Sequence, residues 1–295
     1  MYINHNQMAT QTANTLTSHY SNLSNSVQRL STGLRINSAA DDAAGLAIRE
    51  LMRTDIAALQ QGVRNANDAI SLIQTADGAL AVIDEKLVRM KELAEQAATG
   101  TYDSTQRLMI ESEYQAMASE ITRIANATDF NGVKLLDGNL SSDTHDGSGM
   151  TSTGKMKIHF GTMNDSAEDY YYIQIGTSTA SALGVGNQAT AGSAAYTVST
   201  QEAAQKALVG LNDAVVSKDK IRAHLGALQN RLENTISNLT TQSENLQAAE
   251  SRISDVDVAT EMTKFVRNQI LTQSSVAMLS QANSMPQMAM QLIGG

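Results

Sequence analysis

The sequence has no cysteine, no tryptophan and a single proline, Pro286, and its only aromatic residues are eight tyrosines and three phenylalanines. Without cysteine, the chain cannot form disulfides, use a thiolate nucleophile or bind zinc through sulfur. Enzyme pockets usually combine aromatic side chains with a few titratable groups whose pKa values are shifted. The composition therefore disfavours an enzyme, and we predict no catalytic residue, no cofactor and no metal site.

Basic clusters, long apolar runs and a signal peptide are missing as well. The formal net charge is −9, which disfavours nucleic acid as a partner. No apolar run reaches the ~18 residues that a membrane span needs, so we expect no membrane partner. The N-terminus lacks the basic and apolar segments of a cleaved signal peptide. We expect the chain either to stay in the cytoplasm or to leave the cell by a route that needs no such peptide.

Charge is absent from both ends of the chain. Residues 1–28 and 268–295 contain no Asp, Glu, Lys or Arg, although both segments carry apolar residues at helical spacing. A solvated helix normally has charges on its outer face, so an uncharged helix is either covered or disordered. We favour two ends that pair and are covered further by neighbouring subunits, over two floppy polar tails. The candidate polymerisation residues are Leu16, Leu23, Val27, Leu30, Ile270, Val276, Leu279 and Met285.

Two long segments carry apolar residues at gaps of three and four, the pattern of a coiled coil. The first runs from Leu59 to Ala97 and predicts a helix over residues 43–98, which Thr99 and Gly100 would end. The second runs from Leu208 to Val256. One long amphipathic helix cannot bury its apolar stripe alone, so we expect the two segments to pack against each other lengthwise.

The middle of the chain differs in kind, because residues 129–200 are rich in Gly, Ser, Thr and turn dipeptides and hold two short alternating segments. We predict a mainly α protein, a long antiparallel coiled-coil rod formed by the N- and C-terminal halves with a small β-hairpin region at its tip. The expected domains are the terminal helices 1–43 and 254–295 in an inner core, a helical rod of 44–138 and 201–253, and a solvent-facing tip of 139–200.

Several motifs resemble bacterial flagellin, in the same order along the chain. They are VQRLSTGLRINSAADDAAGLAI at 27–48, RNANDAIS at 64–71, FNGVKL at 130–135, LGALQNRL at 225–232, AESRISDV at 249–256 and QANSMPQ at 281–287. The resemblance covers roughly residues 1–138 and 205–295 and leaves the middle unmatched. It implies a secreted structural subunit that polymerises into the extracellular filament used for swimming. A hook–filament junction protein is the alternative, and a cytoplasmic helical-hairpin signalling module fits the uncharged ends poorly.

The resemblance also implies partners. Family members form a helical homopolymer after passing unfolded through the flagellar export apparatus, use an export chaperone for the C-terminal segment, and meet filament cap and hook-junction proteins. Animals sense flagellin through a Toll-like receptor. The residues that match the receptor-contacting positions are Arg89, Leu93 and Glu113. We expect Arg89 and an exposed Leu93 to share a helix face, with Glu113 on a helix folded back beside them.

Two acidic clusters admit a chemical interpretation that we consider weaker than a structural one. Asp143, His145 and Asp146 suggest a metal site but lie in a Gly- and Ser-rich loop, where solvated side chains are the simpler interpretation. Asp41 and Asp42 suggest general acid–base catalysis. They stand where a helix should begin, so we expect them to cap it instead.

Overall fold

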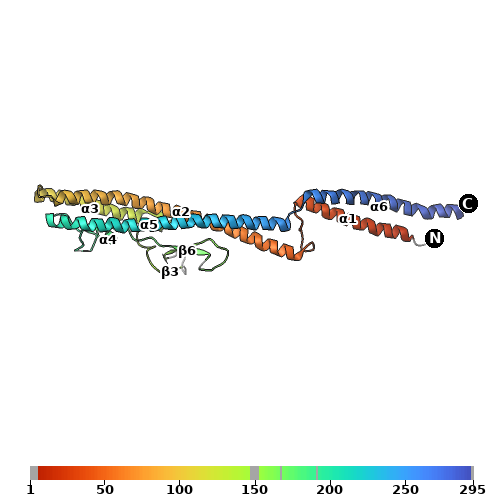
Figure 1. The fold of residues 1–295 in the computed structure, drawn as a ribbon, viewed down its shortest axis with the longest axis horizontal. Helices are drawn as coiled ribbons and strands as arrows, with labels where there is room; N and C mark the ends of the chain where they lie inside the picture. The colour runs from red at the N-terminus through yellow and green to blue at the C-terminus, as the bar shows by residue number, and fades with distance from the viewer. Residues whose placement is uncertain (1–5, 147–152, 167, 191, 294–295) are drawn as a thin grey trace. The chain divides into compact units, whose positions relative to one another are not determined.

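A computed structural model describes residues 6–146, 153–166, 168–190 and 192–293. The chain divides into two compact units, residues 57–243 and residues 1–56 with 244–295. These limits differ from the expected boundaries at 43/44 and 253/254. The helices in the described residues are α1 (Gln7–Thr32), α2 (Ala43–Ala98), α3 (Ser104–Ala127), α4 (Ala180–Leu183), α5 (Gln201–Ser254) and α6 (Val258–Ile293) (Figure 1).

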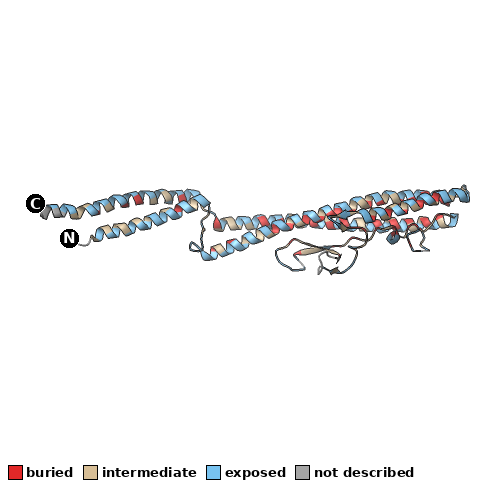
Figure 2. Cartoon of the chain, turned by 180° about the vertical axis from the view of Figure 1, so that it is seen from behind, coloured by how far each residue is buried: buried red, intermediate tan, exposed pale blue. Residues whose placement is uncertain are grey.

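The unit of residues 57–243 is built on α2 and α5, which run antiparallel. Lys91 Nζ donates to Asn212 Oδ1 at 2.8 Å, and Arg222 Nε donates to Asp77 Oδ1 at 2.7 Å, so residue numbers fall along one helix as they rise along the other. Most of the buried residues lie in this unit (Figure 2). The mainly α fold, the helix over 43–98 and the lengthwise pairing are confirmed.

Charged groups interrupt the apolar contact between α2 and α5. Lys218 on α5 is almost fully buried and forms ion pairs with Asp84 on α2 and with Asp219, the latter at 2.8 Å. Buried ion pairs are poor sources of net stability, but they penalise any register that leaves a charge alone. The aspartates of α2 stand seven residues apart, at 77 and 84, so these pairs specify how the two helices align.

Helix α3 folds back on α2. A capping box fixes where it begins, and the spacing of its apolar residues determines which side is buried. Asp103 and Gln106 form a capping box at its N-terminus. Its buried residues recur every three or four positions, at Ile110, Tyr114, Ala118, Ile121 and Ala125. The Tyr114 hydroxyl donates to the carbonyl of Ala195 at 2.7 Å, which ties the long loop before α5 to this helix. Burial, with a smaller effect of Glu111, raises the pKa of Tyr114.

The described residues of the β region form three short antiparallel strand pairs. They are β1 (Asp129–Phe130) with β2 (Val133–Lys134), β3 (His145–Asp146) with β4 (Thr153–Gly154), and β5 (Met156–His159) with β6 (Tyr170–Ile173). The β1–β2 turn has Asn131 at φ 52° and Gly132 at φ 81°, which matches the Asn-Gly hairpin signal in the sequence.

The β5–β6 hairpin lies beside α2, and the solvent-facing tip expected over residues 139–200 stays a prediction. The β5–β6 hairpin packs along the flank of α2, where the Phe160 carbonyl lies against Gly62 and the His159 carbonyl accepts from Asn65 at 2.8 Å. An isolated two-stranded hairpin is only marginally stable. The apolar side of this one, including Ile158 and Ile173, therefore has to be covered by the helices.

The other unit pairs the two ends of the chain. Helices α1 and α6 run antiparallel, because Asn6 Nδ2 donates to the Ala282 carbonyl at 2.8 Å and Ser26 Oγ donates to Glu261 Oε1 at 2.7 Å. Gly33, at φ 72°, ends α1 in the left-handed conformation typical of a helix C-terminus. The predicted pairing of the ends is confirmed.

Two glycines of α2 provide a test of the hairpin placement. A Cβ added at Gly62 would lie 2.0 Å from the Phe160 carbonyl oxygen, whereas one added at Gly78 would meet nothing within 4 Å. Gly62→Ala should lower the free energy of unfolding by about 1–3 kcal/mol through overpacking. Gly78→Ala should raise it by up to about 1 kcal/mol, because alanine is the better helix former. Urea titrations followed by circular dichroism would measure both, and equal effects would contradict this packing.

Candidate assembly surface

Helix α6 leaves its large apolar side chains uncovered. Among its described side chains, the buried ones are Glu261, Thr272, Ser275 and Ala282, all polar or small. The exposed ones include large apolar residues, namely Val258, Met262, Val266, Ile270, Leu271, Val276, Met278 and Met288. Monomeric proteins rarely expose apolar patches of this extent unless a partner covers them.

The exposed apolar residues cover most of the helix circumference. At ~100° per residue they span about 220° of α6, leaving a narrower arc for the contact with α1. Val258, Met262, Val266 and Ile270 follow one another at intervals of four and form one continuous stripe. We call the exposed apolar residues of α6 the outer face of α6. A helix with large apolar residues on several sides is normally covered by protein on those sides.

The predicted polymerisation residues fall into two groups. Leu16, Leu23, Leu30, Leu279 and Met285 are half-buried in the α1–α6 unit. Val27, Ile270 and Val276 remain 48%, 57% and 49% exposed. The predicted residues did not include Val258, Met262 and Val266, which extend the stripe of Ile270. Their spacing is visible in the sequence. The stretch was not included in the charge-free segment because it also contains Glu261, Lys264 and Arg267.

Glu261 is the one buried carboxylate of the described α1–α6 pair. It accepts from Ser26 Oγ at 2.7 Å and from Lys264 Nζ at 3.1 Å. Burial alone would raise the pKa of Glu261, but these hydrogen bonds and the charge of Lys264 outweigh burial and leave the pKa below its ordinary value. The ionised carboxylate therefore ties α1 to α6 in a contact otherwise poor in specific polar bonds.

Asp41 and Asp42 organise the connection between α1 and α2. The Asp41 carboxylate accepts from the backbone N–H groups of Asn37 and Ser38, at 3.2 and 3.1 Å, and its pKa is lowered by these two bonds. It also pairs with Arg29 at 3.2 Å. Asp42 accepts from the Gly45 N–H at 2.9 Å in the first turn of α2. The predicted capping of α2 is confirmed for Asp42, whereas Asp41 binds backbone groups of the loop before the helix.

The structure brings together two of the three candidate receptor residues. Arg89 on α2 donates to Glu113 on α3 at 2.8 and 3.0 Å and to Glu92 at 2.9 Å, and all three side chains are largely exposed. Leu93 is only 1% exposed, so its expected exposure is wrong. It lies three residues after the buried Met90, and α3 covers that side of α2. The sequence showed which residues share a side of α2, but it did not show on which side α3 would pack.

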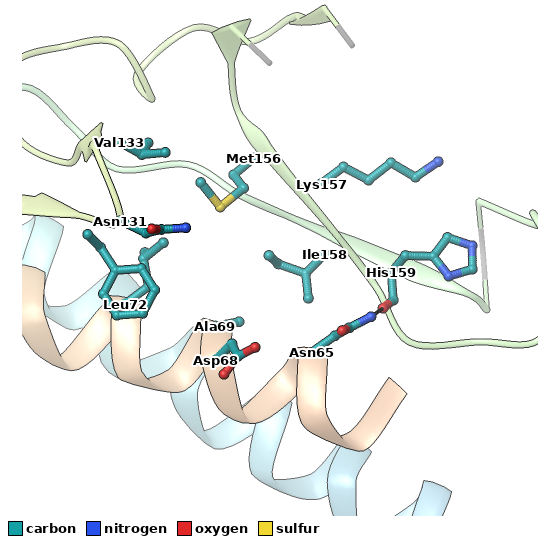
Figure 3. A pocket seen from close by; sticks show the side chains of 11 residues that line it. Asn65, Asp68, Ala69, Leu72, Asn131, Val133, Met156, Lys157, Ile158 and His159 are labelled. Carbon is teal, nitrogen blue, oxygen red and sulfur yellow. Dashed lines mark hydrogen bonds between the residues drawn. The ribbon is translucent and has the colours of Figure 1, made fainter. Parts of the chain in front are cut away.

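An apolar cavity of about 390 Å³ lies between α2, the β1–β2 hairpin and β5 (Figure 3). Ala69, Leu72, Val133, Met156 and Ile158 form its walls, with polar groups such as Asp68 at its edge. The cavity marks where the β region meets α2 without filling the space between them completely.

The Asp143–Asp146 loop is held by protein contacts. His145 Nδ1 lies 2.8 Å from the Lys155 carbonyl oxygen, and Asp143 accepts from Gln174 at 3.0 Å. Within the described parts of the chain, no three His, Cys, Asp or Glu side chains are grouped as a metal would need. None of the helices in those parts combines the length and apolar character of a membrane span.

Comparison with known proteins agrees with this architecture. Residues 3–141 match the bacterial flagellin N-terminal helical region, and residues 208–293 match the bacterial flagellin C-terminal helical region. The flagellar filament 33 kDa core protein of Treponema phagedenis is 41% identical over 99% of this chain and 100% of its own length. Flagellin of Bacillus subtilis (strain 168) is 43% identical over 99% of this chain and 100% of its own length.

One solved structure shares the fold at low sequence identity. The putative flagellar hook-associated protein from Vibrio parahaemolyticus has a TM-score of 0.57, 14% identity, and coverage of 73% of this chain and 100% of that chain. At this identity the likeness concerns the fold alone. The two family regions and the full-length relatives are decisive: the chain belongs to the bacterial flagellin family.

Proposed function

We propose that this chain is the structural subunit of a bacterial flagellar filament, assembled outside the cell and used for swimming. The observation that carries the proposal is the outer face of α6, which the subunit cannot cover by itself. Copies of the same chain supply matching helices with exposed apolar residues. Packing them together would bury this face at roughly 25 cal/mol for each Å² of apolar surface removed from water.

The surface is suited to a repeating assembly rather than to a closed pair. Exposed apolar residues point to several sides of α6, so one neighbour cannot cover them all. Contacts between different surfaces of identical copies generate a helical filament when the rotation does not close into a ring. The full-length similarity to a flagellar filament core protein and to a flagellin supports the filament over the hook–filament junction alternative.

The same surface supports the proposed route to the filament. Before assembly, the outer face of α6 would be exposed to water and prone to aggregate. An export chaperone on the C-terminal segment would shield it, and passage through the export apparatus would deliver the chain to the filament tip. There the cap and the hook-junction proteins would be its neighbours. We infer a structural role rather than catalysis.

Removing the ends should abolish assembly without unfolding the rest. A chain cut to residues 44–254 keeps the buried core of the unit formed by residues 57–243 and should be helical and monomeric. Circular dichroism and sedimentation would measure this, with electron microscopy to look for filaments. Filaments formed by the shortened chain would contradict the role of the ends.

A single substitution tests the outer face more finely. Ile270 is 57% exposed, so Ile270→Asp should leave the helicity of the subunit intact but raise the concentration needed for assembly by roughly tenfold or more, because a charge would be buried between copies. Ile270→Leu is the matched control and should assemble like the original chain. If Ile270→Asp assembles as readily as Ile270→Leu, the stripe is not an assembly contact.

We also propose that the monomer is sensed by the animal Toll-like receptor for flagellin through Arg89 and Glu113. Their hydrogen bonds hold a cationic and an anionic group together on the α2–α3 surface. Leu93 would support this surface from the core rather than contact the receptor.

Arg89→Ala should reduce receptor signalling severalfold in a reporter assay on monomers, since an arginine in a small contact region commonly carries much of the binding energy. Arg123→Ala is the control, because Arg123 makes a similar exposed ion pair with Glu120 at 2.6 Å on α3. Equal signalling by the two variants, or an inactive original chain, would remove this site.

A further inference from the structure

All of the Asp, Glu, Lys and Arg residues of α1 and α6 meet at one place. The two helices contain no others of these types outside this group, although together they extend over Gln7–Thr32 and Val258–Ile293. The four side chains line a cavity of about 360 Å³ within the α1–α6 unit. They are Arg29 from α1 and Glu261, Lys264 and Arg267 from α6.

The cavity is cationic, in contrast to the chain as a whole, whose formal net charge is −9. Glu261 is already engaged by Ser26 and Lys264, and Arg29 shares its charge with Asp41 outside the cavity. Arg267 has no hydrogen bond or ion pair to any residue in the described part of the chain. The lining therefore has more positive charge than its own carboxylate neutralises.

Amide groups complete the lining. Asn22, Asn25 and Asn268 face the same cavity, and their side-chain amides have no hydrogen-bond partner among the described residues. Guanidinium, ammonium and amide N–H groups are the donors that bind oxyanions, and charge-assisted bonds to an oxyanion are stronger than neutral ones. A metal cation would be repelled here, and an apolar ligand would leave these donors unsatisfied.

We propose that this cavity binds a free divalent oxyanion, phosphate or sulfate, held by Arg267 and Lys264 from α6, by Arg29 from α1, and by the asparagine amides. The anion would join α1 to α6 at a point where the direct bonds are few. Binding follows from the geometry of the α1–α6 unit. Its consequence for assembly rests on the proposed filament function.

That consequence is electrostatic. In a filament, the cationic cavity would recur in every copy within a layer of otherwise uncharged helices. Like charges repel more strongly where neighbouring protein replaces water. An oxyanion in each cavity would remove this repulsion and also satisfy the amide donors, so copies carrying the anion should assemble at lower concentration.

The test is equilibrium dialysis of the full-length chain against radiolabelled phosphate at fixed ionic strength in chloride. Filaments and the unassembled fraction are dialysed side by side, and electron microscopy reports separately whether filaments form. The variants are Arg267→Gln and Arg267→Lys. The control is Arg252→Gln, an exposed arginine of α5 that does not line the cavity.

We expect saturable phosphate binding by the original chain, competition by sulfate, and binding weakened roughly tenfold or more in Arg267→Gln. Arg267→Lys should retain more binding than Arg267→Gln, and Arg252→Gln should bind like the original chain. No saturable binding in either fraction, or equal binding by Arg267→Gln, would overturn the proposal. A third result would also overturn it: Arg267→Gln assembles less readily, but the original chain binds no phosphate. In that case a carboxylate of a neighbouring copy, rather than an oxyanion, would fill the cavity. Absence of filaments with phosphate binding intact would instead count against the filament function alone.

Discussion

The two compact units depend on the same constraint and meet it differently: the apolar stripe of a long helix has to be covered by another element. Helices α2, α3 and α5 and the β5–β6 hairpin do this for one another, so that Leu80, Leu87 and Tyr114 have no exposed surface. The α1–α6 pair has only two helices, and α6 is apolar on more sides than α1 can cover. One unit therefore covers its apolar stripes within the chain, whereas the other leaves large apolar residues of α6 exposed, which in the proposed filament further copies would cover.

This difference explains the distribution of charge. In residues 57–243 most charged side chains face solvent, and the pairs Lys218–Asp84 and Arg222–Asp77 specify the alignment of two helices. In the proposed assembly, an outward-facing charge on α1 or α6 would be buried between copies, at a desolvation cost of several kcal/mol per ion. Outer helix positions are therefore often charged in residues 57–243, whereas the corresponding positions of α1 and α6 are mostly uncharged or apolar.

The sequence was sufficient for features that depend on local pattern. Heptad spacing and the Thr99–Gly100 break predict α2 to its ends, Asn131–Gly132 predicts the β1–β2 turn, and the uncharged ends predict the α1–α6 pairing. Features that depend on where a third element packs could not be predicted from the sequence. Leu93 was expected on the surface because the docking side of α3 cannot be read from α2. The contact of the β5–β6 hairpin with α2 was not predicted because the two segments lie far apart in sequence.

The charged cluster of the α1–α6 unit is another feature that could not be predicted from the sequence, because it forms only when distant segments pack together. Along the chain, Glu261, Lys264 and Arg267 look like the ordinary charged residues of a helix surface, and Arg29 looks like a C-terminal helix cation that favours the helix dipole. Only the antiparallel register set by Ser26 with Glu261 and by Asn6 with Ala282 places all four around one cavity. Because no other charge on either helix can compensate, the excess positive charge there is a property of the paired ends. In the proposed filament, an oxyanion from solution would neutralise it.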